Sequence, residues 1–300
     1  MTVRYRYMSS LWGRREFLGL LAASAFVRPL QAQTALRIAA IDWAMLETVV
    51  ALGVTPVAAT ELIQFRKDAV EPPVPAEVTD LGLRGAPNFE LLHLSRPDLI
   101  LISPFYTRYT GRLEAIAPVF SLPFYVKGEP PFANALSAVS ALGEKLGKIN
   151  EAQKVLDETA RSLETMRERL AAFAARPTYI INIGDARHFR AFGADSMFGD
   201  ILDRLGLPNA WKDRSQFTFA APVPLENLAE TPEARIVIVS DIPVEARQSL
   251  RNSVIWQSLT PVRENRVTML ENINPYGGIT AGMRFARLLT EALTTQQGAL

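Results

Sequence analysis

Short apolar runs alternate with helical patterns along most of the 300-residue chain. Apolar runs that predict strands fall at residues 36–41, 99–103 and 119–122, and again at 178–183, 235–240 and 266–270. Segments with helical spacing lie at residues 44–52, 196–205 and 278–293, and another helix is predicted to begin near Asn88, whose side chain suits an N-cap. Because strands alternate with helices in both halves of the chain, the sequence predicts mostly parallel sheets covered by helices.

The middle of the chain has a different pattern. Residues 142–174 contain no proline, and apolar side chains recur there every three or four positions, at Ile149, Ala152, Leu156, Ala160, Leu163, Met166, Leu170 and Phe173. This spacing predicts one long amphipathic helix, and about 25 residues at 1.5 Å each give a rod of roughly 40 Å. We interpret the helix as a rigid connection between an N-terminal lobe, residues 33–141, and a C-terminal lobe, residues 175–300, with a cleft between them. One more surface helix of a single domain is the alternative.

The first 32 residues have the three parts of a bacterial export signal. Arg14 and Arg15 precede an apolar run at residues 17–27, and small and polar residues follow at 30–33. The run is well short of the ~20 apolar residues that span a bilayer as a helix. The paired arginines resemble a twin-arginine signal, and an ordinary secretory signal is the alternative. We therefore expect a periplasmic protein whose signal is cleaved near Ala32.

Composition and charge exclude several classes of protein. The predicted signal holds five of the 32 basic side chains and one of the 31 acidic ones, so the remainder has 27 against 30, a net charge of −3. A nucleic-acid binder needs a cationic face, so we expect no such partner. The absence of cysteine excludes disulfides, thiolate metal sites, cysteine nucleophiles and a lipoprotein anchor.

Residues and motifs typical of common enzymes and metal sites are also scarce. The chain has only two histidines, His93 and His188, which argues against a dedicated zinc, copper or nickel site. It contains no G-x-S-x-G, no Gly-rich phosphate loop and no H-E-x-x-H. We expect no enzyme and no cofactor, and an exported hydrolase that uses carboxylates is the alternative of another class.

Several segments, in order along the chain, resemble one family. They are residues 71–75 (EPPVP), 80–84 (DLGLR), 87–92 (PNFELL), 187–188, 192–193, 196–198, 205–211 (LGLPNAW) and 275–277 (PYG). Together they resemble the periplasmic ferric-hydroxamate-binding proteins of siderophore importers. The resemblance implies an α/β fold of two mixed lobes joined by a single long backbone helix, with a shallow site between them. It also implies a ferric siderophore as ligand and the permease and ATPase subunits of an ABC importer as partners, and we expect a monomer.

The resemblance carries over to individual residues. Arg84 matches the family arginine that reaches the oxygens of the chelate, and Tyr106 and Tyr276 match ligand-facing tyrosines. Such a ligand arrives with its iron already wrapped in oxygen atoms, so it needs no metal ligand from the protein. An aromatic, mostly apolar concavity with a few donors suits it. Trp43, at the end of the first predicted strand, is a further candidate for the cleft, with core packing as the alternative.

The chain also departs from the family pattern. Better-known members have tryptophans at positions that align with Asp68, Ile102, Thr218 and Asn274. Phe217 and Phe219 could restore part of that wall, and the added carboxylate of Asp68 indicates a siderophore of different shape, such as a mixed hydroxamate–carboxylate. A catecholate siderophore, haem or a corrinoid on the same fold is the alternative; a catecholate would need more arginines, of which Arg66, Arg187, Arg190 and Arg284 are available.

Two acidic residues are candidates for docking to the importer. Glu226 matches the family's docking position in the second lobe. The position in the first lobe aligns with Gly111, so Glu114, about one helical turn later, takes its place in our hypothesis. For Glu226 the alternative is a solvated acid at the start of a helix, where the dipole favours negative charge.

Overall fold

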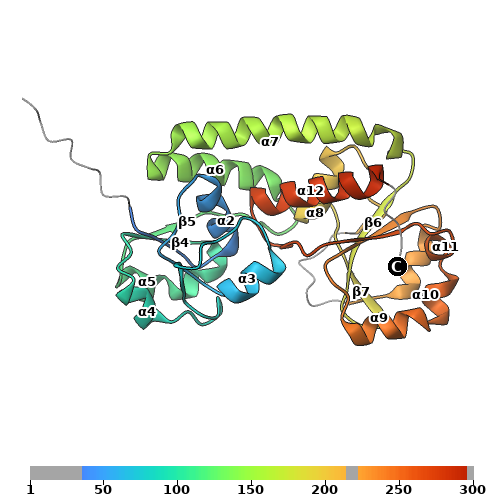
Figure 1. The fold of residues 1–300 in the computed structure, drawn as a ribbon, viewed down its shortest axis with the longest axis horizontal. Coiled ribbons are helices and arrows are strands. Elements are labelled where there is room, and N and C mark those ends of the chain that lie inside the picture. The colour runs from blue at the N-terminus through green and yellow to red at the C-terminus, as the bar shows by residue number, and fades with distance from the viewer. Residues whose placement is uncertain (1–35, 214–221, 296–300) are drawn as a thin grey trace, which may run out of the picture. The chain divides into compact units, whose positions relative to one another are not determined.

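The computed structural model describes residues 36–213 and 222–295, and Leu36–Leu300 form one compact unit. The predicted export signal and the candidates Phe217 and Phe219 lie outside the described residues. Within the described part, no helix is both long and apolar enough to cross a membrane. Figure 1 shows two sheets, a long helix (α7) and helices packed around them.

The first sheet is entirely parallel and has the strand order β3-β2-β1-β4-β5. Its strands are β1 (Ile38–Ala40), β2 (Ala58–Ala59), β3 (Thr79–Asp80), β4 (Leu99–Ile102) and β5 (Val119–Ser121). The helices of this half are α2 (Trp43–Ala51), α3 (Leu62–Asp68), α4 (Phe89–Leu94), the 3-10 helix η2 (Pro104–Tyr109) and α5 (Thr110–Glu114). Every residue of β1 and β4 is buried, as expected for central strands covered on both faces.

Local capping fixes where two of these helices begin. The carboxylate of Asp42 accepts hydrogen bonds from the backbone N–H groups of Ala44 and Met45 at the start of α2. The side chain of Asn88 accepts from two N–H groups at the start of α4, which confirms the predicted N-cap. Asp42 stands at the end of β1, so the same carboxylate that begins α2 also faces the edge where the strands of the sheet end.

The second sheet is mixed, with the strand order β10-β9-β6-β7-β8. Its strands are β6 (Thr178–Ile183), β7 (His188–Ala191), β8 (Val223–Pro224), β9 (Arg235–Val239) and β10 (Val267–Leu270). Strands β6, β9 and β10 are parallel, whereas β7 runs antiparallel to both β6 and β8. The helices of this half are α8 (Met197–Arg204), η4 (Leu225–Glu230), α9 (Val244–Arg251), α10 (Val254–Ser258), α11 (Thr260–Arg263) and α12 (Ile279–Thr294).

The predicted long helix is α7, which runs from Ile149 to Leu170 and is followed by a 3-10 turn, η3 (Ala171–Phe173). Its 22 residues span roughly 33 Å, somewhat less than expected, because residues 142–146 belong to the preceding helix α6 (Phe132–Leu146). Gly147 ends α6 with a left-handed backbone conformation, φ 66°. The fold of two mixed α/β lobes joined by a long helix is therefore confirmed, while the lobe boundaries stay a prediction.

One buried apolar cluster is shared by both halves of the chain. It contains Ile38 of β1, Ile180 of β6 and Val237 of β9, together with side chains of α2, α6, α7, α8 and α12. The last helix, α12, packs against α7, α8, α6 and also α2, which lies near the start of the described chain. As a result, the loop between β10 and α12, which carries Tyr276, lies against residues of the first half.

Candidate functional site

Arg84 lies in the loop after β3, and two side chains fix its guanidinium group. Its Cζ atom lies 3.8 Å from the centroid of the Trp43 ring, and its Nε atom donates to Oε2 of Glu61 at 2.5 Å. The Arg84 side chain is 31% exposed, and among the described residues no hydrogen bond uses its two Nη atoms. The stack and the ion pair thus hold the group in one orientation and leave its terminal donors available.

The Trp43 ring stacks against the guanidinium group of Arg84 and is itself held in place. Its indole is only 4% exposed, its Nε1 atom donates to the carbonyl of Thr60 at 3.0 Å, and its ring packs edge-on against Phe65. Both anchors belong to the interior of the first half, so Trp43 presents mainly a fixed surface for the guanidinium group. Its direct contact with a ligand stays a prediction.

Tyr106 lies on η2, next to the same cluster. Its side chain is 5% exposed, and burial raises the pKa of its phenol, with the negative charge of Asp42 acting in the same direction and Arg84 opposing it. Asp42 in turn accepts a hydrogen bond from Oγ of Ser103 at 2.8 Å, which ties the end of β1 to the end of β4. Burial also raises the pKa of the Asp42 carboxyl group, although its hydrogen bonds and Arg84 oppose the shift.

Three large apolar side chains within two positions of cluster residues in the chain are exposed. Ile63 on α3 is 81% exposed, Leu83 beside Arg84 is 65% exposed, and Phe105 beside Tyr106 is 80% exposed. Large apolar groups left in water next to convergent donors are typical of a ligand-binding surface. The sequence interpretation missed all three, although two of them are chain neighbours of predicted site residues.

Tyr276 belongs to a second cluster, in the loop before α12. Its ring packs edge-on against the ring of Tyr125, with 5.4 Å between the centroids. The Tyr125 hydroxyl donates to the carbonyl of Gly277 at 2.6 Å. Burial raises the pKa of the Tyr276 phenol, and the positive charge of Arg190 partly offsets that effect.

A single buried carboxylate fixes the backbone on both sides of Tyr276. Glu47, on α2, is fully buried and accepts from Nδ2 of Asn274 at 2.7 Å and from the N–H group of Gly278 at 2.7 Å. Oδ1 of Asn274 accepts from the N–H group of Tyr276 at 3.0 Å. A third, longer bond of 3.3 Å comes from Ala281 in the first turn of α12. Burial raises the pKa of Glu47 to about 8, against the effect of these three donors.

The approach of the loop to Glu47 requires glycine. A Cβ atom on Gly277 would lie 2.4 Å from Oε2 of Glu47 and 2.3 Å from Cβ of Ala281. A Cβ atom on Gly278 would lie 2.9 Å from Oγ1 of Thr48. The Gly-Gly pair after Tyr276 is thus explained by the tight contact between α2 and the start of α12.

The structure brings some predicted residues together and separates others. Arg84, Tyr106 and Trp43 form one cluster, and Tyr276 lies in the other. Helix α2 links the two clusters, because it carries Trp43 of the first and Glu47, which holds the loop of the second.

The positions that carry tryptophan in better-known members of the family have different surroundings here. Ile102 is 1% exposed and Asn274 is 2% exposed, so neither side chain forms a wall of the site. Asp68 ends α3 and accepts a hydrogen bond from Gln64 at 2.7 Å.

Residues 38–273 match the family described as periplasmic binding protein. The chain belongs to this family. It is 30% identical over 257 residues to the iron(3+)-hydroxamate-binding protein FhuD of Escherichia coli, a match that covers 86% of each chain. It is 25% identical over 269 residues to the achromobactin-binding periplasmic protein of Dickeya dadantii, covering 84% of this chain and 83% of the relative. The crystal structure of FhuD from Vibrio cholerae with bound Fe3+–Desferal superposes with a TM-score of 0.81 and 25% identity, covering 87% and 98% of the two chains.

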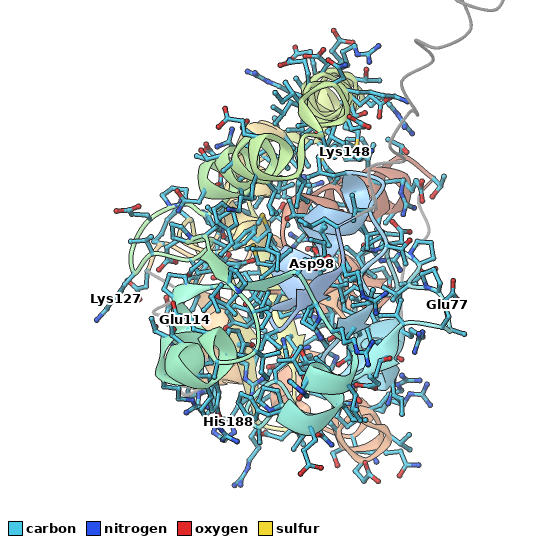
Figure 2. All side chains as sticks on the ribbon, turned by 90° about the vertical axis from the view of Figure 1, so that its left-hand side faces the viewer. Glu77, Asp98, Glu114, Lys127, Lys148 and His188 are labelled. Carbon is cyan, nitrogen blue, oxygen red and sulfur yellow. The ribbon has the colours of Figure 1, made fainter. Side chains whose placement is uncertain are left out.

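This periplasmic binding protein thus groups with relatives named as binding proteins, of which the two FhuD proteins are named for a ferric complex. Among its described residues, no group of three or more His, Asp or Glu side chains could hold a metal ion. His188, the first residue of β7, pairs with Asp185 of the preceding turn at 3.1 Å. Both predicted docking residues are exposed: Glu226 on η4 and Glu114 at the end of α5. Glu114 is labelled at the surface in Figure 2.

Proposed function

We propose that the protein binds an iron(III)–siderophore complex of the hydroxamate type and delivers it to an ABC importer. The observation that carries the proposal is Arg84, whose guanidinium group is fixed by Trp43 and Glu61 while its terminal nitrogens remain available. A prearranged donor loses little conformational freedom when a ligand arrives. Glu226 and Glu114 are the proposed contacts with the permease.

The surroundings of Arg84 suit the chemistry of such a ligand. A tris-hydroxamate complex of Fe³⁺ is close to neutral at its core and presents oxygen atoms and apolar chain at its surface. Charge-assisted hydrogen bonds from Arg84 serve the oxygen atoms. The exposed side chains of Ile63, Leu83 and Phe105 serve the apolar chain. The iron needs no protein ligand, because the siderophore already fills its coordination sphere.

Titration of the mature protein with ferric hydroxamates tests the proposal. Tryptophan fluorescence is the readout, because Trp43 lies directly under Arg84. We expect saturable quenching by at least one complex of the ferrichrome, coprogen or ferrioxamine type, and none by the iron-free chelators. Failure of all three complexes to bind would reject the hydroxamate assignment. Haem is tested in parallel by its Soret band.

Tyr106→Phe is expected to weaken binding by about 1 kcal/mol, roughly 5-fold, with little change in stability. The Tyr106 hydroxyl makes no hydrogen bond with the described residues, so its loss leaves the fold intact. Tyr179→Phe is the matched control, because the Tyr179 hydroxyl donates to Thr231 in the second half. Calorimetric titration and thermal unfolding of both variants separate the two effects. A Tyr106→Phe protein with wild-type affinity would remove this hydroxyl from the site.

A further inference from the structure

A cavity of about 540 Å³ lies beside the Tyr276 loop. Side chains of α3, β7 and α9 line it, as do Asn272 and Pro275 from the loop itself (the elements are labelled in Figure 1). Asn272 connects two of its walls, because Nδ2 donates to the carbonyl of Lys67 at 3.2 Å and Oδ1 accepts from the N–H group of Asp241 at 2.8 Å. The cavity therefore has a fixed wall next to the proposed ligand residue Tyr276.

Three cationic side chains line this cavity: Lys67 on α3, Arg190 on β7 and Arg247 on α9. Two carboxylates, Asp68 and Asp241, line it as well. Neither carboxylate is within ion-pair distance of Lys67 or Arg247, and those two cations have no ion pair with any described residue. The positive charges of Lys67 and Arg247 are thus not neutralised by direct pairing with Asp68 or Asp241.

The two arginines face the cavity in different ways. The Nε atom of Arg247 is buried and has no hydrogen-bond partner, and its Nη2 atom has only a long bond of 3.4 Å to the carbonyl of Ile242. Because the Nε atom is buried, the terminal nitrogens of Arg247, of which Nη2 has only this long bond, are the donors that a ligand in the cavity can use. Arg190 lines the cavity from β7, and Pro275, which directly precedes Tyr276, lines it as well, so the cavity adjoins the site.

We propose that this cavity receives a carboxylate arm of the ferric siderophore, so that the preferred cargo is a hydroxamate chelate with a free carboxylate. The assignment rests on the proposed function, because it takes the hydroxamate core to lie against Arg84, Tyr106 and Tyr276. Guanidinium groups bind carboxylates through two parallel hydrogen bonds, and a concave wall concentrates their field. A cationic arm would be disfavoured by the same charges.

One chelate with three different arms tests this specificity. The ferric complex of desferrioxamine B is titrated with its terminal amine free, acetylated or succinylated, so that the arm is positive, neutral or negative on an unchanged iron core. We expect the succinylated complex to bind about 10-fold tighter than the acetylated one, and the free amine to bind most weakly. High salt should reduce the difference. Equal affinities of the three complexes would overturn the carboxylate assignment and leave the proposed function standing. Absence of binding by all three would overturn the carboxylate assignment, and the ferrichrome and coprogen titrations would then decide the proposed function separately.

Two variants test whether the preference for the succinylated arm arises in this cavity. Arg247→Gln and Lys67→Gln are each expected to reduce the preference for the succinylated arm to 3-fold or less, without changing the affinity for the acetylated complex. Lys67 is exposed, so its replacement does not endanger folding. Arg251→Gln is the control, because Arg251 is an exposed cation at the end of the same helix α9 and does not line the cavity. A full preference retained in both cavity variants would contradict the assignment.

Discussion

Replacement of Glu47 by alanine is expected to lower the free energy of unfolding by roughly 3–5 kcal/mol. The change removes the acceptor of three buried donors, from Asn274, Gly278 and Ala281, and leaves a cavity where α2 meets the start of α12. Chemical denaturation at constant pH measures the loss. Thr48→Ala is the control, because the neighbouring buried hydroxyl bonds only within its own helix, to the carbonyl of Ala44. A Glu47→Ala protein no less stable than Thr48→Ala would show that the carboxylate does not hold the Tyr276 loop.

The pH dependence of stability gives Glu47 a second signature. Burial raises its pKa to about 8 in the folded protein, above the ordinary value of 4.5, so the folded state binds this proton more tightly than the unfolded state does. The resulting stabilisation is fully present below pH 4.5 and is lost as the pH rises toward 8. Because Glu47→Gln cannot titrate, its free energy of unfolding should fall less than that of the wild type between pH 5 and pH 8. Identical slopes for the two proteins would contradict the raised pKa.

Arg84→Ala is expected to weaken binding of a ferric hydroxamate by about 1.5–3 kcal/mol, roughly 10- to 150-fold. The variant loses the donors aimed at the chelate and also leaves the carboxylate of Glu61, whose side chain is 18% exposed, without its ion pair. Arg84→Lys keeps the charge but lacks the planar fork and the stack on Trp43, so it should recover only part of the affinity. Calorimetric titration measures both variants.

A closely matched arginine provides the control for Arg84. Arg204 on α8 also lies over an aromatic ring, that of Phe132, and also pairs through Nε with a carboxylate, that of Asp200, at 2.7 Å. It belongs to neither cluster of the site. Arg204→Ala should therefore affect stability but leave affinity unchanged. Wild-type affinity in a folded Arg84→Ala protein would exclude Arg84 from the site.

Much of the fold could be predicted because its signals are local. The six predicted strands are present with ends that differ by at most two residues, and the cap at Asn88 follows from a single side chain and the N–H groups after it. The two-residue strands β2 and β3 carry too few positions to show a period. The strand β7 is short and alternates intermediate with buried positions within a polar segment, so it was missed.

The contacts that hold the Tyr276 loop could not be predicted from local sequence patterns. Glu47 and Asn274 lie 227 positions apart, and only the packing of α12 on α2 brings them together. One signal was nevertheless present. In the segment 43–51, WAMLETVVA, all residues except Glu47 and Thr48 are apolar. The helix therefore has no polar face on which a charged Glu47 could be solvated. A helix that is apolar all round is buried, and its single acid must then find donors inside the protein.

The shared apolar cluster has a consequence for biosynthesis. Its members run from Ile38 near the start of the described chain to Leu289 in α12. A ribosome-bound fragment that lacks α12 therefore cannot form the complete cluster. Until α12 has been synthesised and docks, α2 would present its apolar surface, and the unpaired Glu47, to solvent or to chaperones. The first sheet can assemble before that, but the loop that presents Tyr276 acquires its shape only when the sixteen-residue helix α12 docks.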